Sequence, residues 1–275
     1  MTFRQKLLAA ARVNDSWLCV GLDVALALLP ASLPPKVESV VAFNQAIVEA
    51  TADLVCAYKP NLAFYEAMGL PGLEALRRTL DLIPGHIPVI ADAKRGDVGH
   101  TAQAYAQALF ETFGFDAATV NPYLGRDALQ PFLDHADRGV FVLCRTSNPG
   151  AADFQDLSID GRPLYQVVAE KVLEWNEHGN VGLVVGATYP REVERVRALS
   201  QEMPLLVPGV GAQAGDLWAA TRAAANARGE LAVVNSSRQV IYASRGADFA
   251  EAARRSALTL RDEINQARLD RAASG

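Results

Sequence analysis

The chain has 275 residues, half of them hydrophobic and 21% charged, with a formal net charge of -5 at pH 7. This length and this apolar share suffice for one large core of the size found in α/β barrels. The acidic balance, without any basic block interleaved with aromatic residues, excludes nucleic acid as the expected partner.

The N-terminal segment, MTFRQKLLAAARVNDSW, places two basic residues before a short apolar run. That run is too short for a signal peptide, and Arg12 interrupts it at once. We therefore expect an amphipathic helix with Phe3, Leu7, Leu8 and Ala11 on one face. No stretch approaches the roughly 18 uninterrupted apolar residues of a membrane span, so we expect a cytoplasmic protein without a membrane partner.

Short apolar runs rich in Val, Leu and Ile recur along the chain. They lack strict polar alternation, which is typical of parallel strands that helices bury on both faces. The runs occupy residues 17–23, 54–60, 87–94, 117–123, 140–146, 181–188, 204–209 and 231–237. Three of them hold Cys19, Cys56 and Cys144, whose spacing indicates neither disulfides nor a metal site; we expect buried thiols in a reducing compartment.

Segments with helical spacing separate these runs, and Gly and Pro mark the joins. The predicted helices include residues 37–51, 73–83, 101–113, 164–178 and 191–200. Eight strand–helix units predict an α/β fold of the (β/α)₈ TIM-barrel type. An open doubly wound sheet is the alternative, although GLDVALALLP follows the first strand where such a sheet often carries GxGxxG.

We expect one catalytic domain over residues 1–275, because no repeat, low-complexity tract or linker divides the chain. The segment 147–163 is too long and polar for a plain connection, which suggests an active-site loop. Residues 267–275, ARLDRAASG, are expected to form a fraying tail.

Charged side chains stand where the first three runs end, and the βα loops of a barrel carry its chemistry. The first run ends in Asp23, the second in Lys59, and the third in Asp92 and Lys94. Side chains two positions apart on a strand share a face, and Lys59 from a neighbouring strand can stand beside both. Such carboxylates hold the ammonium groups charged. Structural ion pairing is the alternative interpretation.

The loops after the last two strands have a different character. PGVGAQ covers 208–213 and NSSRQV covers 235–240, so small residues, free amides and Arg238 gather there. Loops seven and eight of a barrel commonly bind phosphate, and on an acidic chain they favour a phosphorylated small molecule.

The segment DAKRGDVGHT, residues 92–101, closely resembles the D-x-K-x-x-D motif of orotidine 5'-phosphate decarboxylases, particularly their longer bacterial subgroup. Further stretches agree in order from about Leu18 to Ser244. They are GLD, YKPN, NPYLG, RTSNPG, PGVGAQ and NSSRQVIYAS.

The resemblance implies a charged tetrad in which Lys94 donates the proton, completed by Lys59, Asp92 and Asp97. It also implies a homodimer, because Asp97 and Thr101 would reach into the neighbouring subunit's site. Gly96 permits a turn before Asp97, whose direction alternation does not predict. His100 stands where a small polar residue is expected.

The same resemblance assigns the remaining contacts. Asp23 would bind the ribose, Ser147 the pyrimidine, and Gln213 and Arg238 the phosphate. The implied reaction converts orotidine 5'-phosphate to uridine 5'-phosphate and CO₂ in pyrimidine biosynthesis, without metal or cofactor.

Three alternatives stay open. A Mg²⁺-dependent sugar-phosphate decarboxylase or hexulose-phosphate synthase shares the scaffold and the D-x-K-x-x-D spacing. A Schiff-base aldolase would use Lys59 or Lys94 with a lowered pKa, which the neighbouring carboxylates oppose. A non-catalytic nucleotide-binding module would keep the phosphate grip but need no intact tetrad.

Overall fold

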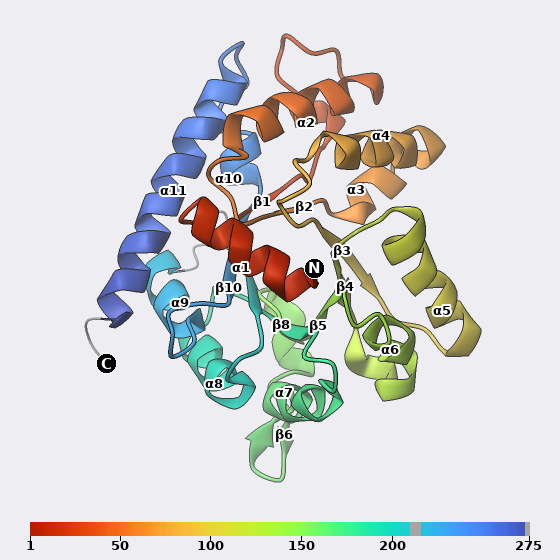
Figure 1. Cartoon of the computed structure of the whole chain (residues 1–275), viewed down its shortest axis with the longest axis vertical. Coiled ribbons are helices and arrows are strands. Elements are labelled where there is room, and N and C mark those ends of the chain that lie inside the picture. The colour runs from red at the N-terminus through yellow and green to blue at the C-terminus, as the bar shows by residue number, and fades with distance from the viewer. Residues whose placement is uncertain (210–215, 273–275) are drawn as a thin grey trace.

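The computed structural model describes residues 1–209 and 216–272. Within them, the eight predicted apolar runs form parallel strands of one sheet (Figure 1). These strands are β1 (Leu18–Gly21), β2 (Ala57–Lys59), β3 (Ile90–Arg95), β4 (Ala117–Val120), β5 (Gly139–Arg145), β8 (Val181–Val185), β9 (Leu205–Pro208) and β10 (Ala232–Ser236).

The sheet closes on itself. Its strand order is β2-β1-β10-β9-β8-β5-β4-β3. Parallel bridges from Tyr58 to Val89 and from Asn61 to Asp92 join the two end strands, and the Tyr58 amide donates to the Pro88 carbonyl at 3.0 Å. The predicted (β/α)₈ barrel is therefore confirmed, and the open doubly wound sheet is excluded.

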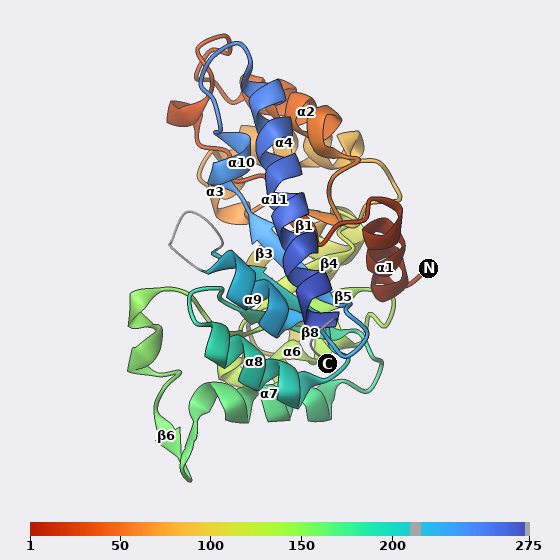
Figure 2. The ribbon, with the colours of Figure 1, turned by 90° about the vertical axis from the view of Figure 1, so that its left-hand side faces the viewer.

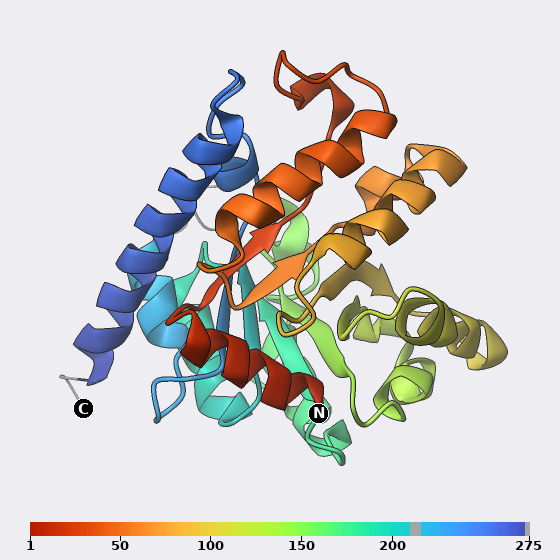
Figure 3. The same ribbon diagram turned by 45° about the horizontal axis from the view of Figure 1, so that its top comes forward.

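Helices surround the barrel, as the side view in Figure 2 and the tilted view in Figure 3 show. They are α1 (Phe3–Val13), α2 (Glu38–Thr51), α3 (Leu62–Glu66), α4 (Gly69–Leu82), α5 (Gly99–Gln107), α6 (Arg126–Leu133), α7 (Leu164–Trp175), α8 (Pro190–Ser200), α9 (Leu217–Ala224), α10 (Arg238–Ile241) and α11 (Phe249–Ala272). None of the helices within the described ranges has the length and hydropathy that crossing a membrane requires.

Several helix ends differ from the sequence-based expectation. Helix α4 begins at Gly69 and not at residue 73, and α7 ends at Trp175 and not at residue 178. The predicted helix 101–113 is an α-helix only to Gln107, and a π-helical turn, Ala108–Thr112, follows. The expected tail from residue 267 is corrected as far as Ala272, because α11 continues to that residue. Ala267 is buried there, and the Arg268 guanidinium pairs with Asp15 at 2.5 Å.

The segment 147–163 after β5, which the sequence predicts to be an active-site loop, contains short secondary structure. It includes the 3₁₀ turn Pro149–Asp153 and a small hairpin of β6 (Ser158–Ile159) and β7 (Arg162–Pro163). The three cysteines are buried and free, as expected. Burial raises the pKa of the Cys19 and Cys144 thiols to about 12, which makes both of them unreactive.

Each strand contributes one side chain to a cluster that fills the barrel interior. The contributors are Cys19, Ala57, Ile90, Ala117, Phe141, Val184, Leu206 and Val233. Helix α1 lies across one mouth of the barrel in Figure 1 and adds Phe3 and Leu7 to this cluster. Its predicted buried face is therefore observed, with Leu8 and Ala11 half-buried at the margin.

Phe3 closes that mouth of the barrel. Its ring meets Phe141 edge-on with centroids 5.6 Å apart, and it is 5% exposed. A Cβ at Gly139 would lie 2.3 Å from the Phe3 ring, so the bottom of β5 needs a residue without a side chain. The helix supports this contact through a capping box between Thr2 and Gln5.

We expect Phe3→Ala to lower the free energy of unfolding by about 3 kcal/mol, because it empties a closed apolar site. Urea denaturation followed by circular dichroism measures the change. Val13→Ala on the same helix is the control, since Val13 is 74% exposed. Equal stability of the two variants would show that α1 does not seal the barrel.

Candidate active site

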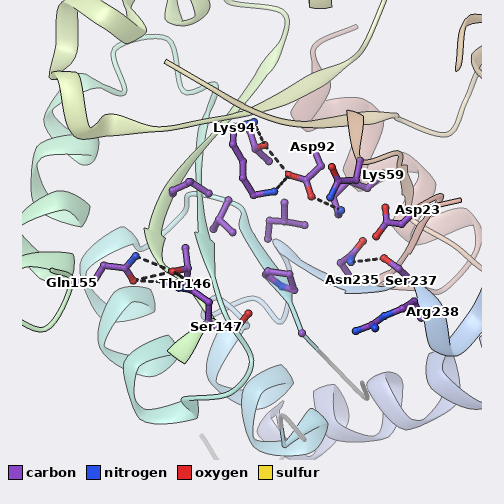
Figure 4. A pocket seen from close by; sticks show the side chains of 18 residues that line it. Asp23, Lys59, Asp92, Lys94, Thr146, Ser147, Gln155, Asn235, Ser237 and Arg238 are labelled. Atoms are coloured by element: carbon purple, nitrogen blue, oxygen red, sulfur yellow. Dashed lines mark hydrogen bonds and ion pairs between the residues drawn. The ribbon is translucent and has the colours of Figure 1, made fainter. Parts of the chain in front are cut away.

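A cavity of about 530 Å³ opens at the carboxyl ends of the strands. This is the end of a TIM barrel that carries catalytic sites, and the volume suits a small-molecule ligand. Six of the predicted site residues line it, as Figure 4 shows: Asp23, Lys59, Asp92, Lys94, Ser147 and Arg238.

Asp92 stands between two ammonium groups. The Lys59 Nζ atom donates to its Oδ2 at 2.9 Å, and the Lys94 Nζ atom donates to its Oδ1 at 2.5 Å. The Lys59 side chain is 3% exposed, whereas that of Lys94 is 49% exposed. One carboxylate thus orients a buried cation and a cation that faces the cavity.

The charges of this cluster stabilise one another. Burial alone would lower the pKa of Lys59, but the negative charges of Asp92 and Asp23 outweigh it and raise that pKa. Burial would likewise raise the pKa of Asp92, but Lys59 and then Lys94 hold it well below its usual range. Both groups are therefore charged at neutral pH.

The backbone of β3 bulges at this point. Ala91 pairs with Ala118 and Arg95 with Val120, so the residues between Ala91 and Arg95 lie opposite Thr119 alone. Lys94 has a left-handed φ of 50°. Gly96 does not need a positive φ; instead, a Cβ there would lie 2.8 Å from the Asn121 carbonyl oxygen. The residue of the motif with a strained backbone conformation is thus Lys94. Gly96 instead allows the backbone to approach Asn121, which follows the next strand.

The cavity wall next to Lys59 also presents polar atoms without partners among the described residues (Figure 4). The buried Oδ1 atoms of Asp23 and Asn235 have no hydrogen-bond partner among the described residues. Asn235 donates weakly to Ser237, at 3.4 Å, beside Arg238 at the start of α10. A Cβ at Gly21 would lie 1.9 Å from Ser237 Oγ, so glycine is required for this loop to sit against β1. Asp23 and Asn235 both line the cavity, and each has an oxygen whose hydrogen-bonding capacity is unused.

The loop after β5 is held against the cavity. Gln155 accepts from the Thr146 amide at 2.8 Å and donates to the Thr146 hydroxyl at 2.9 Å. The buried Arg145 guanidinium pairs with Asp156 at 3.0 Å and lies over the Tyr189 ring at 4.5 Å. These contacts place the neighbouring Ser147 at the cavity edge.

Asp97 and Thr101 do not line this cavity. Asp97 Oδ1 accepts the amide of Val98 at 2.8 Å, and Thr101 belongs to the first turn of α5. His100 is exposed on the same turn. The predicted phosphate contact Gln213 lies outside the described residues.

Several lining residues were not singled out from the sequence, among them Asn61, Thr119, Gln155, Asn235 and Ser237. Asn61 and the Asn235–Ser237 stretch were inside the quoted motifs YKPN and NSSRQV, so position directly after a strand end could have identified them. Gln155 lies within segment 147–163, the predicted active-site loop, but nothing singled it out there. Thr119 carried no signal, since a threonine inside a strand usually indicates only strand propensity.

The donor set also bears on metal binding. Within residues 1–209 and 216–272, no three His, Cys, Asp or Glu side chains are grouped as metal ligands would be. Both oxygens of Asp92 instead accept hydrogen bonds from ammonium groups. The cluster is built to hold cationic side chains.

A TIM barrel whose cavity is lined by a Lys–Asp–Lys cluster and an arginine is typical of an enzyme that acts on small anionic substrates. Residues 16–255 match the family described as "Orotidine 5'-phosphate decarboxylase / HUMPS family". The chain belongs to this family.

Individual proteins agree with this assignment. The chain is 57% identical to the orotidine 5'-phosphate decarboxylase of Roseiflexus sp. (strain RS-1), over 98% of this chain and 100% of that one. It is 57% identical to that of Herpetosiphon aurantiacus, over 92% and 94%. The solved structure of Leishmania donovani OMP decarboxylase superposes with a TM-score of 0.86 at 41% identity, covering 98% and 100% of the two chains.

We expect Asp92→Asn to lower the free energy of unfolding by roughly 3–5 kcal/mol at pH 7, because it leaves the buried Lys59 ammonium without its counter-charge. Chemical denaturation measures the loss. Glu74→Gln is the matched control, since it removes a carboxylate from the exposed pair with Arg77 and is expected to change little.

The pH dependence has a definite sign. Because the folded-state pKa of Asp92 lies below its usual value, its contribution is present above about pH 4 and is lost as the pH falls further. The stability gap between wild type and Asp92→Asn should therefore narrow on acidification. A gap that is constant down to pH 2.5 would contradict the ion-pair assignment.

Proposed function

We propose that this chain catalyses the decarboxylation of orotidine 5'-phosphate to uridine 5'-phosphate and CO₂, without metal or cofactor. This is the reaction of pyrimidine biosynthesis after which its relatives are named. One observation carries the proposal: the cavity-facing Lys94 ammonium is fixed by Asp92 at 2.5 Å, in a cavity whose wall also holds Arg238. A cation at one end and an anion site at the other match a substrate with a reacting carboxylate and a phosphate.

The chemistry follows from charge. Cleavage of the bond between C6 and the carboxylate carbon releases CO₂ and leaves the electron pair on C6, in the ring plane, where no carbonyl group delocalises it. An ammonium preorganised opposite C6 stabilises that charge and then transfers one proton to it. Lys94 would supply both effects, and the neutral amine would regain its proton from solvent.

The other site residues have supporting roles in this proposal. Lys59 and Asp92 hold Lys94, while Asp23, with its unpartnered buried oxygen, would bind the ribose. Ser147 would contact the pyrimidine ring. Arg238 and Gln213 would bind the phosphate, whose remote binding energy lowers the barrier at C6.

The proposed working unit is a homodimer. Asp97 and Thr101 lie outside their own chain's cavity but follow directly from the strand that carries Lys94. Both would reach into the neighbouring subunit's site, where Asp97 would complete the tetrad. We also propose that residues 1–275 form a single catalytic domain. The three free, buried thiols support a cytoplasmic location, which belongs to the same proposal.

The alternatives fit the cavity less well. The family description also names HUMPS. A Mg²⁺-dependent sugar-phosphate decarboxylase or hexulose-phosphate synthase is therefore the nearest alternative. Engagement of both Asp92 oxygens by ammonium groups disfavours such a site. The raised pKa of Lys59 opposes Schiff-base chemistry there. Loss of activity in EDTA, with recovery on adding Mg²⁺, would support the metal-dependent branch.

We expect Lys94→Ala to reduce kcat by at least about 10³-fold and to leave product binding intact, because the phosphate and ribose contacts are elsewhere. Loss of ultraviolet absorbance on adding orotidine 5'-phosphate measures the rate, and calorimetry with uridine 5'-phosphate measures binding. Lys171→Ala, on the exposed face of α7, is the control. Near-wild-type turnover by Lys94→Ala would refute the assignment.

The shared site is testable by mixing subunits. Lys94→Ala and Asp97→Ala chains should each be inactive alone, yet co-expression should restore about one quarter of wild-type activity, since half the dimers gain one intact site. Mixed samples as inactive as the separate variants would place both residues in one chain's site.

A further inference from the structure

The hydroxyl of Thr119 touches the catalytic cluster on three sides. Its Oγ1 atom accepts from the Ala93 amide at 3.0 Å and from the Lys94 amide at 2.9 Å, and it donates to Asp92 Oδ1 at 3.1 Å. The residue is 1% exposed and lines the cavity from β4. One side chain thus contacts both the backbone of Lys94 and the carboxylate that holds the Lys94 ammonium.

These contacts occur where the backbone is irregular. The bulge of β3 removes residues 92–94 from regular pairing with β4, so the Ala93 and Lys94 amides bond to Thr119 Oγ1 instead. Lys94 also holds a left-handed φ of 50°, which residues with a side chain rarely adopt. Such a conformation persists only where its surroundings enforce it.

The hydroxyl suits this position by its valence. It has one hydrogen to donate and two lone pairs to accept, and here all three are used. Valine has the same shape but neither function, so it would leave the Ala93 and Lys94 amides without this acceptor and remove one of the two hydrogen bonds to Asp92 Oδ1. Serine would keep all three bonds. The site therefore selects for the hydroxyl group and not merely for volume.

We propose that Thr119 is a positioning residue for Lys94: its hydroxyl fixes the bulged backbone and Asp92 together, so that the Lys94 ammonium points at the reacting carbon. This inference rests on the proposed decarboxylation. Thr119 takes no part in the proton transfer itself.

The test compares Thr119→Val with Thr119→Ser. We expect the valine variant to lose about 10- to 100-fold in kcat with KM within about threefold, because a shift of order 1 Å in a catalytic group carries a cost of that size. The serine variant should keep kcat within about threefold of wild type. Thr119→Ala, which adds no methyl group against Asp92, replaces the valine variant if that fails to fold.

Thr79→Val is the matched control. Thr79 is fully buried in α4, where its hydroxyl donates to the Ala75 carbonyl at 2.8 Å and accepts from Asn44 at 3.0 Å. Thr79 and its two partners do not line the cavity, so losing this hydroxyl should lower stability but not kcat. Wild-type kcat in a folded Thr119→Val, or equal losses in the serine and valine variants, would overturn the inference.

Two further measurements separate this inference from the proposed function. If Lys94→Ala abolishes turnover while Thr119→Val does not, only the role of Thr119 fails. If wild type does not decarboxylate orotidine 5'-phosphate, the proposed function fails, and a crystal structure of Thr119→Val still decides the positioning. We expect Lys94 to leave its left-handed conformation in that crystal; an unchanged Lys94 and Asp92 would refute the role.

Discussion

The carboxylate of Asp92, buried between two ammonium groups, is the interaction on which the site depends. Taking Lys59 out of water is unfavourable unless a counter-charge accompanies it, and Asp92 supplies that charge at 2.9 Å. The second oxygen of Asp92 then orients Lys94. A buried pair of this kind is a weak source of stability, so the fold must be stabilised elsewhere and the pair is retained for what it positions.

That stabilisation comes from apolar packing, in a large cluster that joins strand and helix residues and in a smaller one inside the barrel. The interior cluster takes one side chain from every strand, and Phe3 and Leu7 of α1 cover it. The closed apolar end and the open charged end are therefore separate along the strands. β5 illustrates the division, since Gly139 packs under Phe3 at its start while Arg145 anchors the cavity loop at its end.

Sequence patterns predicted the strands and the cluster because both follow from local rules. Buried parallel strands appear in the sequence as apolar runs, and charged residues at their carboxyl ends must lie at the same end of the barrel. Thr119 could not be found this way, since its role arises from a bulge that changes the register between β3 and β4. The end of α11 was also missed, because Arg268 is stabilised there by Asp15 and the Trp17 ring, which are distant in sequence.

The exposure of the two lysines distinguishes their roles. Lys59 is enclosed by its own chain, whereas Lys94 is half-exposed and held by one carboxylate and by the backbone contacts of Thr119. An ammonium with water on one side stabilises a carbanion poorly, because water screens its charge. The described chain therefore contains the machinery to aim Lys94 but not to enclose it. Substrate and the neighbouring subunit's Asp97, in the proposed dimer, are the groups that would exclude this water and raise the electrostatic effect of the cluster.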